Sequence, residues 1–152
     1  VLDLIQELTG IPELIAGGFT ATWYRAGDFL MPHTDDSQEK VVAVILYLTK
    51  DFEALSEGAL VWCNPHTVLP SRFNSLILFL VGRHSRHLVD LVRSENGKRL
   101  AVSGWFRFGG QKGAAAYDKW FERSMRMSEG TNSTERRVLV INGERRCKLR
   151  SC

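Results

Sequence analysis

Residues 41–48 read Val-Val-Ala-Val-Ile-Leu-Tyr-Leu, and this β-branched run predicts a buried strand. Side chains alternate between the two faces of a strand. One face therefore carries Val41, Ala43, Ile45 and Tyr47, and the other carries Val42, Val44, Leu46 and Leu48. Because both faces are apolar, we expect this strand to lie between two packed layers.

Further short strands surround this run and are separated by turn residues. They are predicted at residues 19–25, 59–62, 75–81, 86–92 and 98–108, and a short amphipathic helix is predicted at residues 2–8. Many short strands with turn signals between them are typical of a double-sheet jelly roll. The sequence thus predicts a mainly β domain over residues 1–108.

The chain changes character after residue 108. A glycine-rich break is followed by a predicted helix at residues 114–127, a polar linker, and a candidate hairpin at 138–149 whose Asn-Gly pair suits a type I′ turn. Residues 1–106 carry a net charge of −3, whereas residues 107–152 carry +6. We interpret 109–152 as a basic C-terminal extension, which is either a solvated appendage or a segment that steers the protein to RNA, ribosomes or acidic partners.

A candidate metal site begins at His33-Thr34-Asp35, just before the central strand. Two imidazoles and one carboxylate on one side of an octahedral ion form the 2-His-1-carboxylate arrangement of non-haem Fe(II) oxygenases. A histidine and a carboxylate at this spacing are also common in ordinary loops. The pair therefore predicts a metal site only together with a second histidine.

The third ligand must be His66, His84 or His87, which are the other histidines of the chain. His66 follows an Asn-Pro pair and is interpreted as a turn residue, and His84 lies in a polar connection, where a histidine is most simply solvated. His87 opens a predicted strand and shares a face with apolar residues. Because a buried histidine needs a partner, the pattern favours His87.

Arg99 presents a similar pattern in the last long strand. Alternation places it on one face with Ala101, Ser103 and Trp105. A buried guanidinium costs several kcal/mol unless it is paired, and its planar fork suits a bidentate carboxylate. A surface arginine on an edge strand is the alternative. With the metal motif nearby, the pattern predicts that Arg99 binds an acidic co-substrate.

Several segments occur in a fixed order along residues 2–106. They are Leu8 to Pro12, Tyr24 to Asp35, Ile45 to Leu48, Pro70 to Phe79, His87 to Val89 and Arg99 to Phe106. In this order they resemble the 2-oxoglutarate- and Fe(II)-dependent dioxygenases, specifically the prolyl-hydroxylase-like branch that includes the ribosomal and hypoxia-factor prolyl hydroxylases. The chain departs from that pattern at Gly58-Ala59, where relatives usually carry two glycines.

The resemblance implies a double-stranded β-helix, a jelly-roll and cupin-like fold, with Fe(II) and 2-oxoglutarate in its cavity. It also implies a role for individual residues. These are His33, Asp35 and His87 for Fe(II), Arg99 for the distal carboxylate of 2-oxoglutarate, Tyr47 and Ser103 as its helpers, and Tyr24 at the other end of the co-substrate. For both tyrosines, an ordinary core or pocket aromatic is the alternative.

The implied activity is that of a prolyl 4-hydroxylase-like enzyme. In the family, oxidative decarboxylation of 2-oxoglutarate by dioxygen yields succinate and carbon dioxide and drives hydroxylation of an unactivated C–H bond, with ascorbate as a supporting reductant. We expect a prolyl residue of a protein or peptide as the substrate, with a free amino acid or another small molecule as the alternative. A jelly-roll binding module that keeps the metal site without turnover is the second hypothesis.

Composition agrees with a small single-domain protein. The chain has 152 residues, 44% of them hydrophobic, which is enough to bury a core. It has no run of eighteen apolar residues, and its first eight are too short and too acidic for a signal peptide, so we expect neither a membrane span nor secretion. Cys63, Cys147 and Cys152 are odd in number and lack zinc spacing, which predicts reduced thiols in a cytoplasmic protein.

Overall fold

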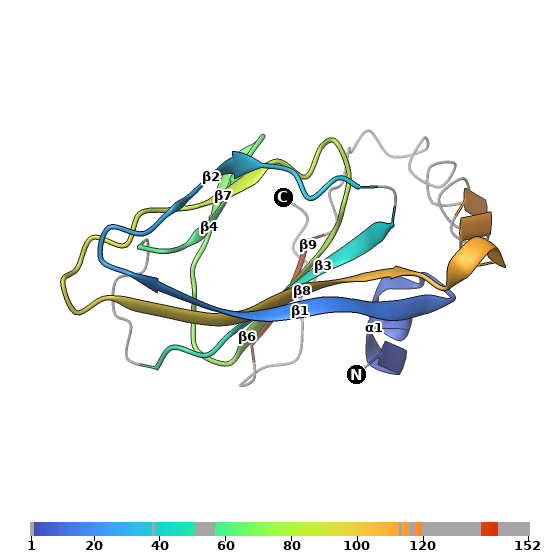
Figure 1. Cartoon of the computed structure of the whole chain (residues 1–152), viewed down its shortest axis with the longest axis horizontal. Helices are drawn as coiled ribbons and strands as arrows, with labels where there is room; N and C mark the ends of the chain where they lie inside the picture. Colours follow the sequence, from blue (N-terminus) through green and yellow to red (C-terminus); the bar gives the residue numbers. More distant parts are fainter. Residues whose placement is uncertain are drawn as a thin grey trace.

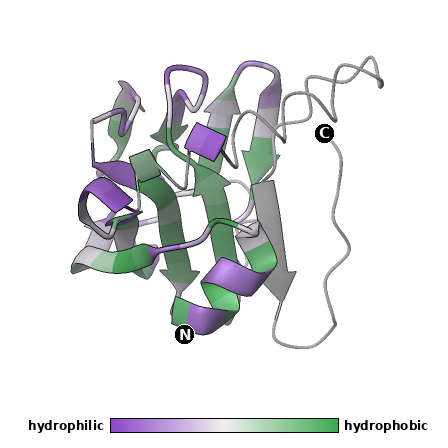
Figure 2. Ribbon diagram, turned by 90° about the vertical axis from the view of Figure 1, so that its right-hand side faces the viewer, coloured by the Kyte–Doolittle hydropathy of each residue, from purple (hydrophilic) through white to green (hydrophobic). Residues whose placement is uncertain are grey.

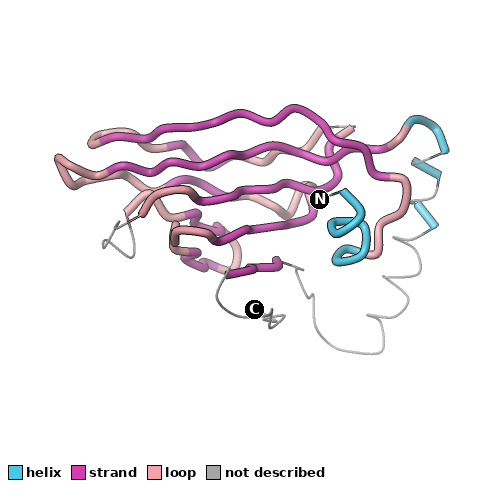
Figure 3. Tube along the Cα trace, turned by 90° about the horizontal axis from the view of Figure 1, so that it is seen from below, coloured by secondary structure: helices cyan, strands magenta, loops and turns pink. Residues whose placement is uncertain are grey.

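The structure is a computed structural model that describes residues 2–37, 39–50, 57–112, 114–115, 118–119 and 138–142. Its elements are α1 (Leu2–Thr9), β1 (Leu14–Arg25), β2 (Leu30–His33), β3 (Lys40–Tyr47), β4 (Leu60–Cys63), β5 (His66–Leu69), β6 (Ser75–Leu80), β7 (His87–Val89), β8 (Lys98–Phe108) and β9 (Val138–Asn142). The larger sheet has the antiparallel strand order β1-β8-β3-β6-β9, and the smaller sheet has the order β2-β7-β4-β5 (Figures 1 and 3). The predicted jelly-roll fold with a short N-terminal helix is confirmed.

The central strand β3 lies inside the larger sheet, between β8 and β6. Its side chains Ala43, Ile45 and Tyr47 belong to an inner apolar cluster, which also contains residues of β4 and so fills the space between the sheets. Val42 and Val44 belong to an outer cluster, which packs with α1 on the opposite face of the larger sheet. The predicted burial of both faces is therefore confirmed within β3, whereas Leu48, which was predicted as the last residue of the strand, lies beyond its end and is exposed.

Val41 does not follow the predicted alternation. The pairing between β3 and β8 shifts register between Lys40 and Val42, so β3 carries an extra residue there, which is a β-bulge. Val41 consequently packs in the outer cluster beside Val42 and not with Ala43 in the inner cluster. The prediction for Val41 was wrong because a bulge interrupts the two-residue period.

Helix α1 covers part of the outer face of the larger sheet (Figure 2). Its residue Ile5 is fully buried in the outer cluster together with Ile11 and Leu14. The helix is followed by Gly10, whose φ of 69° suits a helix C-terminus and whose N–H donates to the carbonyl of Gln6 at 2.8 Å. The predicted N-terminal helix is confirmed and is one residue longer.

Strand β1 forms an edge of the larger sheet and begins at Leu14, earlier than predicted. Its pairing with β8 shifts register between Ala16 and Phe19, and this bulge contains two glycines. A Cβ at Gly17 would lie 2.5 Å from the carbonyl oxygen of Trp105, so the close approach of the two strands requires glycine. The bulge breaks the alternation that would have revealed the first part of the strand.

The smaller sheet contains two strands that the sequence did not predict. β2 contains Pro32 and lies at the sheet edge, where a missing backbone donor is tolerated. His66, predicted as a turn residue, is instead the first residue of β5 and pairs with Cys63 of β4. The strand predicted at residues 86–92 is observed as the shorter β7, which begins at His87 and ends at Val89. Short edge strands leave too few residues for a clear period.

The C-terminal region is described only in part. Residues 110–112, 114–115 and 118–119 are helical, which agrees with the beginning of the predicted helix. β9 pairs with β6 and adds a fifth strand to the larger sheet. The rest of the predicted helix and the second half of the candidate hairpin lie outside the described residues. The separate role of this basic extension stays a prediction.

Two smaller findings concern the predicted environment of the chain. Cys63 of β4 is a free cysteine, and the other two cysteines lie outside the described residues. Among the helices that the structure describes, none is long and apolar enough to cross a membrane.

Candidate metal and anion site

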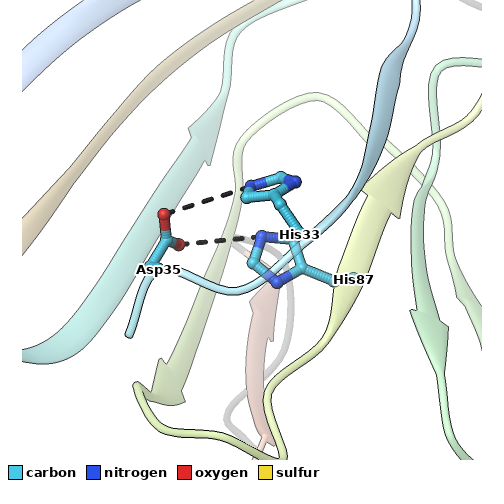
Figure 4. A group of neighbouring side chains, drawn as sticks. All are labelled: His33, Asp35 and His87. Carbon is cyan, nitrogen blue, oxygen red and sulfur yellow. Dashed lines mark ion pairs between the residues drawn. The ribbon is translucent and has the colours of Figure 1, made fainter. Parts of the chain in front are cut away.

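Two histidines and one aspartate meet on the smaller sheet (Figure 4). His33 ends β2 and His87 begins β7, and the two residues are paired across these antiparallel strands. Asp35 follows β2, and its Oδ1 lies 4.0 Å from His33 Nε2 while its Oδ2 lies 3.7 Å from His87 Nε2. One ligand atom from each residue lies within 4.8 Å of the other two. We call these three residues the metal group.

Both imidazole rings are held by backbone carbonyl groups. Nδ1 of His33 lies 2.8 Å from the carbonyl oxygen of Met31, and Nδ1 of His87 lies 2.7 Å from that of Ser85. In the tautomer with the proton on Nδ1, this nitrogen donates to the carbonyl and leaves a lone pair on Nε2. Each Nε2 faces Asp35, so the hydrogen bonds orient both rings for a shared ion.

His87 is almost fully buried among aromatic residues. Trp62 of β4 stacks on its ring with centroids 6.0 Å apart, and Phe79 of β6 meets it edge-on at 5.0 Å. This burial holds the pKa of His87 below its usual value, so the neutral imidazole is available as a ligand. Sequence reasoning missed both aromatics, although each lies in a predicted strand.

The donor set fits a divalent transition metal. Two neutral imidazole nitrogens and one carboxylate are the ligands of the 2-His-1-carboxylate type, which leaves positions for further ligands. His66 on β5 and His84 in a loop are both exposed, and neither joins the metal group. The structure thus brings together the histidine pair that the sequence pattern favoured.

The metal group faces a cavity of about 280 Å³ between the two sheets. This volume is at the lower end of the roughly 300–1,000 Å³ that is typical of ligand pockets, which is enough for a small molecule. Residues of both sheets line it, among them the metal group, Tyr24, Arg99, Ser103 and Trp105. The metal group and the predicted anion-binding arginine therefore share one cavity.

Arg99 of β8 is a buried cation with an exposed fraction of 3%. The rings of Tyr24 and Tyr47 each lie 5.0 Å from its Cζ, so the guanidinium contacts two aromatic side chains. Within the described residues it forms no ion pair, and its Nε has no hydrogen-bond acceptor. We call Arg99, Tyr24 and Tyr47 the anion clamp. Because an unpaired buried cation is costly, the anion clamp favours an anion in the cavity.

The three predicted helper residues lie in or next to the cavity. The hydroxyl of Tyr47 is buried without a partner among the described residues, and burial raises its pKa, so it stays a protonated donor. Ser103 lines the cavity from β8. Tyr24 lies against Arg99, nearer to the guanidinium than the resemblance implies for a residue at the other end of the co-substrate.

Ala59 lies just before β4, where relatives usually carry a glycine, and this difference does not disturb the anion clamp. Gly58 has a φ of 61°, which favours glycine, and a Cβ there would lie 2.9 Å from Cδ of Arg99. Ala59, where relatives usually carry the second glycine, is fully buried and does not have a positive φ. Of these two positions, only Gly58 requires glycine.

Residues 19–107, more than half of the chain, match the family described as the 2OG-Fe(II) oxygenase superfamily. The chain belongs to this superfamily. A curated relative of this chain is prolyl 3-hydroxylase OGFOD1 of Mus musculus, which is 33% identical over 111 residues that cover 67% of this chain and 20% of that protein. The chain spans about a fifth of the length of the curated relatives it matches.

Solved prolyl hydroxylases share the fold of this chain. The viral collagen prolyl hydroxylase vCPH from Paramecium Bursaria Chlorella virus-1, in its 2OG complex, has a TM-score of 0.56 and 17% identity over 70% of this chain and 72% of that chain. A prolyl hydroxylase from Trichoplax adhaerens, in complex with a hypoxia inducible factor peptide fragment, has a TM-score of 0.56 and 20% identity over 75% and 57%. At these identities, the likeness shows the fold.

Proposed function

We propose that this chain is the catalytic region of an Fe(II)- and 2-oxoglutarate-dependent hydroxylase that acts on a prolyl residue of a protein. The shared cavity carries the proposal, because the metal group lines it from the smaller sheet and Arg99 lines it from the larger sheet. A dicarboxylate that binds a metal through one end has its other carboxylate free for a guanidinium. The buried and unpaired state of Arg99 supports this role.

The metal group would hold Fe(II) through Nε2 of His33, Nε2 of His87 and the carboxylate of Asp35. When bound, Fe(II) supplies the redox chemistry that couples decarboxylation of 2-oxoglutarate by dioxygen to hydroxylation of a C–H bond. The carbonyl hydrogen bonds to each Nδ1 keep both imidazoles in the ligating tautomer. Trp62 and Phe79 shield His87 from water, which protects this side of the site from competing ligands.

The anion clamp would hold the distal carboxylate of 2-oxoglutarate. Arg99 offers two parallel N–H donors, and the rings of Tyr24 and Tyr47 pack against its guanidinium. The hydroxyls of Tyr47 and Ser103 are further donors for the same carboxylate. This orients the co-substrate so that its other end reaches the metal group.

The proposed substrate is a prolyl residue in a polypeptide. The curated relative is named a prolyl 3-hydroxylase, and two solved proteins of this fold are prolyl hydroxylases, one of them in complex with a peptide. The cavity is lined by residues of β1 and β2, which are edge strands of the two sheets. A polypeptide that approaches between these edges would bring one side chain to the metal group.

The test measures succinate release from 2-oxoglutarate under air, with Fe(II) and ascorbate, in the presence of proline-containing peptides. Each peptide is paired with a version in which alanine replaces proline, and His84→Ala is the matched control for His87→Ala. We expect succinate release and the gain of one oxygen atom only with proline-containing peptides. Activity should be lost in His87→Ala and kept in His84→Ala.

Other outcomes would redirect the proposal. Binding of metal and 2-oxoglutarate without succinate release, with every peptide, would identify a binding module that keeps the site without turnover. Hydroxylation of free proline or another small molecule, but not of peptides, would show that the substrate is a small molecule and not a polypeptide. Failure to bind both metal and 2-oxoglutarate would overturn the oxygenase assignment for this chain.

A further inference from the structure

Lys40, the first residue of β3, reaches the metal group from the larger sheet. Its Nζ lies 3.9 Å from Oδ1 of Asp35 and 3.7 Å from the centroid of the Trp105 ring. The side chains of Lys40 and Asp35 are 31% and 14% exposed, so their contact is partly shielded from water. Among the described residues, Lys40 is the only lysine or arginine that forms an ion pair with the metal group.

The bulge in β3 explains how Lys40 reaches this position. Strict alternation would send it to the outer face with Val42 and Val44, which pack in the outer cluster. The register shift between Lys40 and Val42 adds one residue, and the lysine turns instead toward Trp105 on the cavity side. Bulges commonly re-aim a side chain beside an active site. The place of this charge is therefore set by the backbone of β3.

A divalent ion at the metal group would compete with Lys40 for one carboxylate. Coulomb energy scales with the product of the charges, so a doubly charged ion beside Asp35 repels the nearby ammonium strongly. A bound ion also partly neutralises the carboxylate of Asp35, which weakens the attraction between Asp35 and Lys40. Both effects oppose metal binding, and both depend on the charge of Lys40.

We propose that Lys40 is a positioning residue that holds Asp35 as a counter-cation and lowers the affinity of the site for divalent metal. The inference rests on the proposed metal role of His33, Asp35 and His87. Lys40 is not among the residues that line the cavity. Because pairwise Coulomb energies add, its effect on metal affinity should be the same with and without a dicarboxylate in the cavity.

The experiment measures binding of Mn(II) to the full chain by electron paramagnetic resonance of the free ion, with and without 2-oxoglutarate. Lys40→Met removes the charge and keeps an unbranched side chain over Trp105, and Lys40→Gln is a second uncharged variant. Lys40→Arg keeps the charge. Lys50→Met is the matched control, because Nζ of Lys50 also lies over an aromatic ring, that of Phe73 at 5.1 Å, away from the metal group.

We expect Lys40→Met and Lys40→Gln to bind Mn(II) tighter than the wild type by about threefold or more at low salt. This difference should close as the ionic strength rises from about 0.01 M to about 1 M, where the Debye length falls from about 30 Å to about 3 Å. Lys40→Arg and Lys50→Met should match the wild type. Addition of 2-oxoglutarate should strengthen Mn(II) binding by the same factor in the wild type and in Lys40→Met.

Mn(II) binding by both uncharged variants that is equal to or weaker than that of the wild type overturns the proposal. Its failure can be told apart from failure of the metal assignment. If His87→Ala binds Mn(II) as tightly as the wild type, the metal group itself is wrongly assigned. If His87→Ala loses the ion while the Lys40 variants match the wild type, only the role of Lys40 is rejected.

Discussion

The two ends of the cavity are built in different ways. The metal group stands on β2 and β7, strands of four and three residues, and the side chain of His33 is 33% exposed. The anion clamp stands mainly on the long strands β1 and β8, of twelve and eleven residues, and Tyr47 of β3 is fully buried. One end thus stands on short strands and includes one partly exposed ligand beside the buried His87, and the other end stands on long strands of the core.

Different interactions hold the side chains in place at the two ends of the cavity. Two backbone carbonyls orient the imidazoles of the metal group, so the position of each ligand depends mostly on its own strand end. The clamp depends on burial among residues of three strands, because Tyr24, Tyr47 and Arg99 come from β1, β3 and β8. Substitutions at the metal end should therefore affect binding more than folding, whereas those in the clamp should affect both.

Replacing the metal group should have the largest effect on binding. We expect His33→Ala, Asp35→Ala and His87→Ala each to lower Mn(II) affinity by more than about 100-fold, because loss of an outer partner of a ligand already costs about 10- to 100-fold. His84→Ala and His66→Ala, measured in the same titration, should keep the affinity of the wild type. Loss of binding in His84→Ala with retention in His87→Ala would reverse the assignment of the third ligand.

Replacing Arg99 should have the next largest effect. We expect Arg99→Ala to lower 2-oxoglutarate affinity at least about tenfold, because truncating one partner of a buried charge pair costs about 2–5 kcal/mol. Arg99→Lys should not restore it, since an ammonium lacks the planar fork. Calorimetric titration of the Mn(II)-loaded protein measures both. Unchanged affinity in Arg99→Ala would place the anion site elsewhere, with Lys98 as the next candidate.

A smaller effect should follow from filling the space beside the clamp. We expect Gly58→Ala to lower 2-oxoglutarate affinity about fivefold, or about 1 kcal/mol, because its Cβ would press on the Arg99 side chain at 2.9 Å. Gly27→Ala is the matched control, since Gly27 also has a positive φ but no atom within 4 Å of an added Cβ. Equal loss of affinity in both variants would mean that backbone strain, and not contact with Arg99, is responsible.

The smallest effect should come from the buried hydroxyl of the clamp. Tyr47→Phe removes a group that has no partner within the described part of the chain, so we expect the free energy of unfolding to change by less than about 1 kcal/mol. Affinity for 2-oxoglutarate should fall about threefold, because one donor to the carboxylate is lost. Chemical denaturation and titration test the two expectations separately. A large loss of stability would show that the hydroxyl bonds a residue outside the described ranges.

The same contrast decides what the sequence could predict. In a long regular strand, alternation correctly placed Arg99 inside the domain, and the order of residue types singled out His33, Asp35 and His87 for the metal group. Lys40 could not be found in this way, because a bulge reverses its face. The pairing of β9 with β6 joins segments far apart in the chain, and no local pattern encodes such a contact.

The edge strand β1 has a consequence for association between copies of the protein. Within the described part of the chain, β1 has no second partner strand along its twelve residues, and such an edge is a template for another strand and so a route to aggregation. The bulge at Gly17 and Gly18 divides this edge into two shorter stretches that a straight incoming strand cannot pair with in one register. The glycines that allow close approach to β8 thus also protect the open edge against self-association.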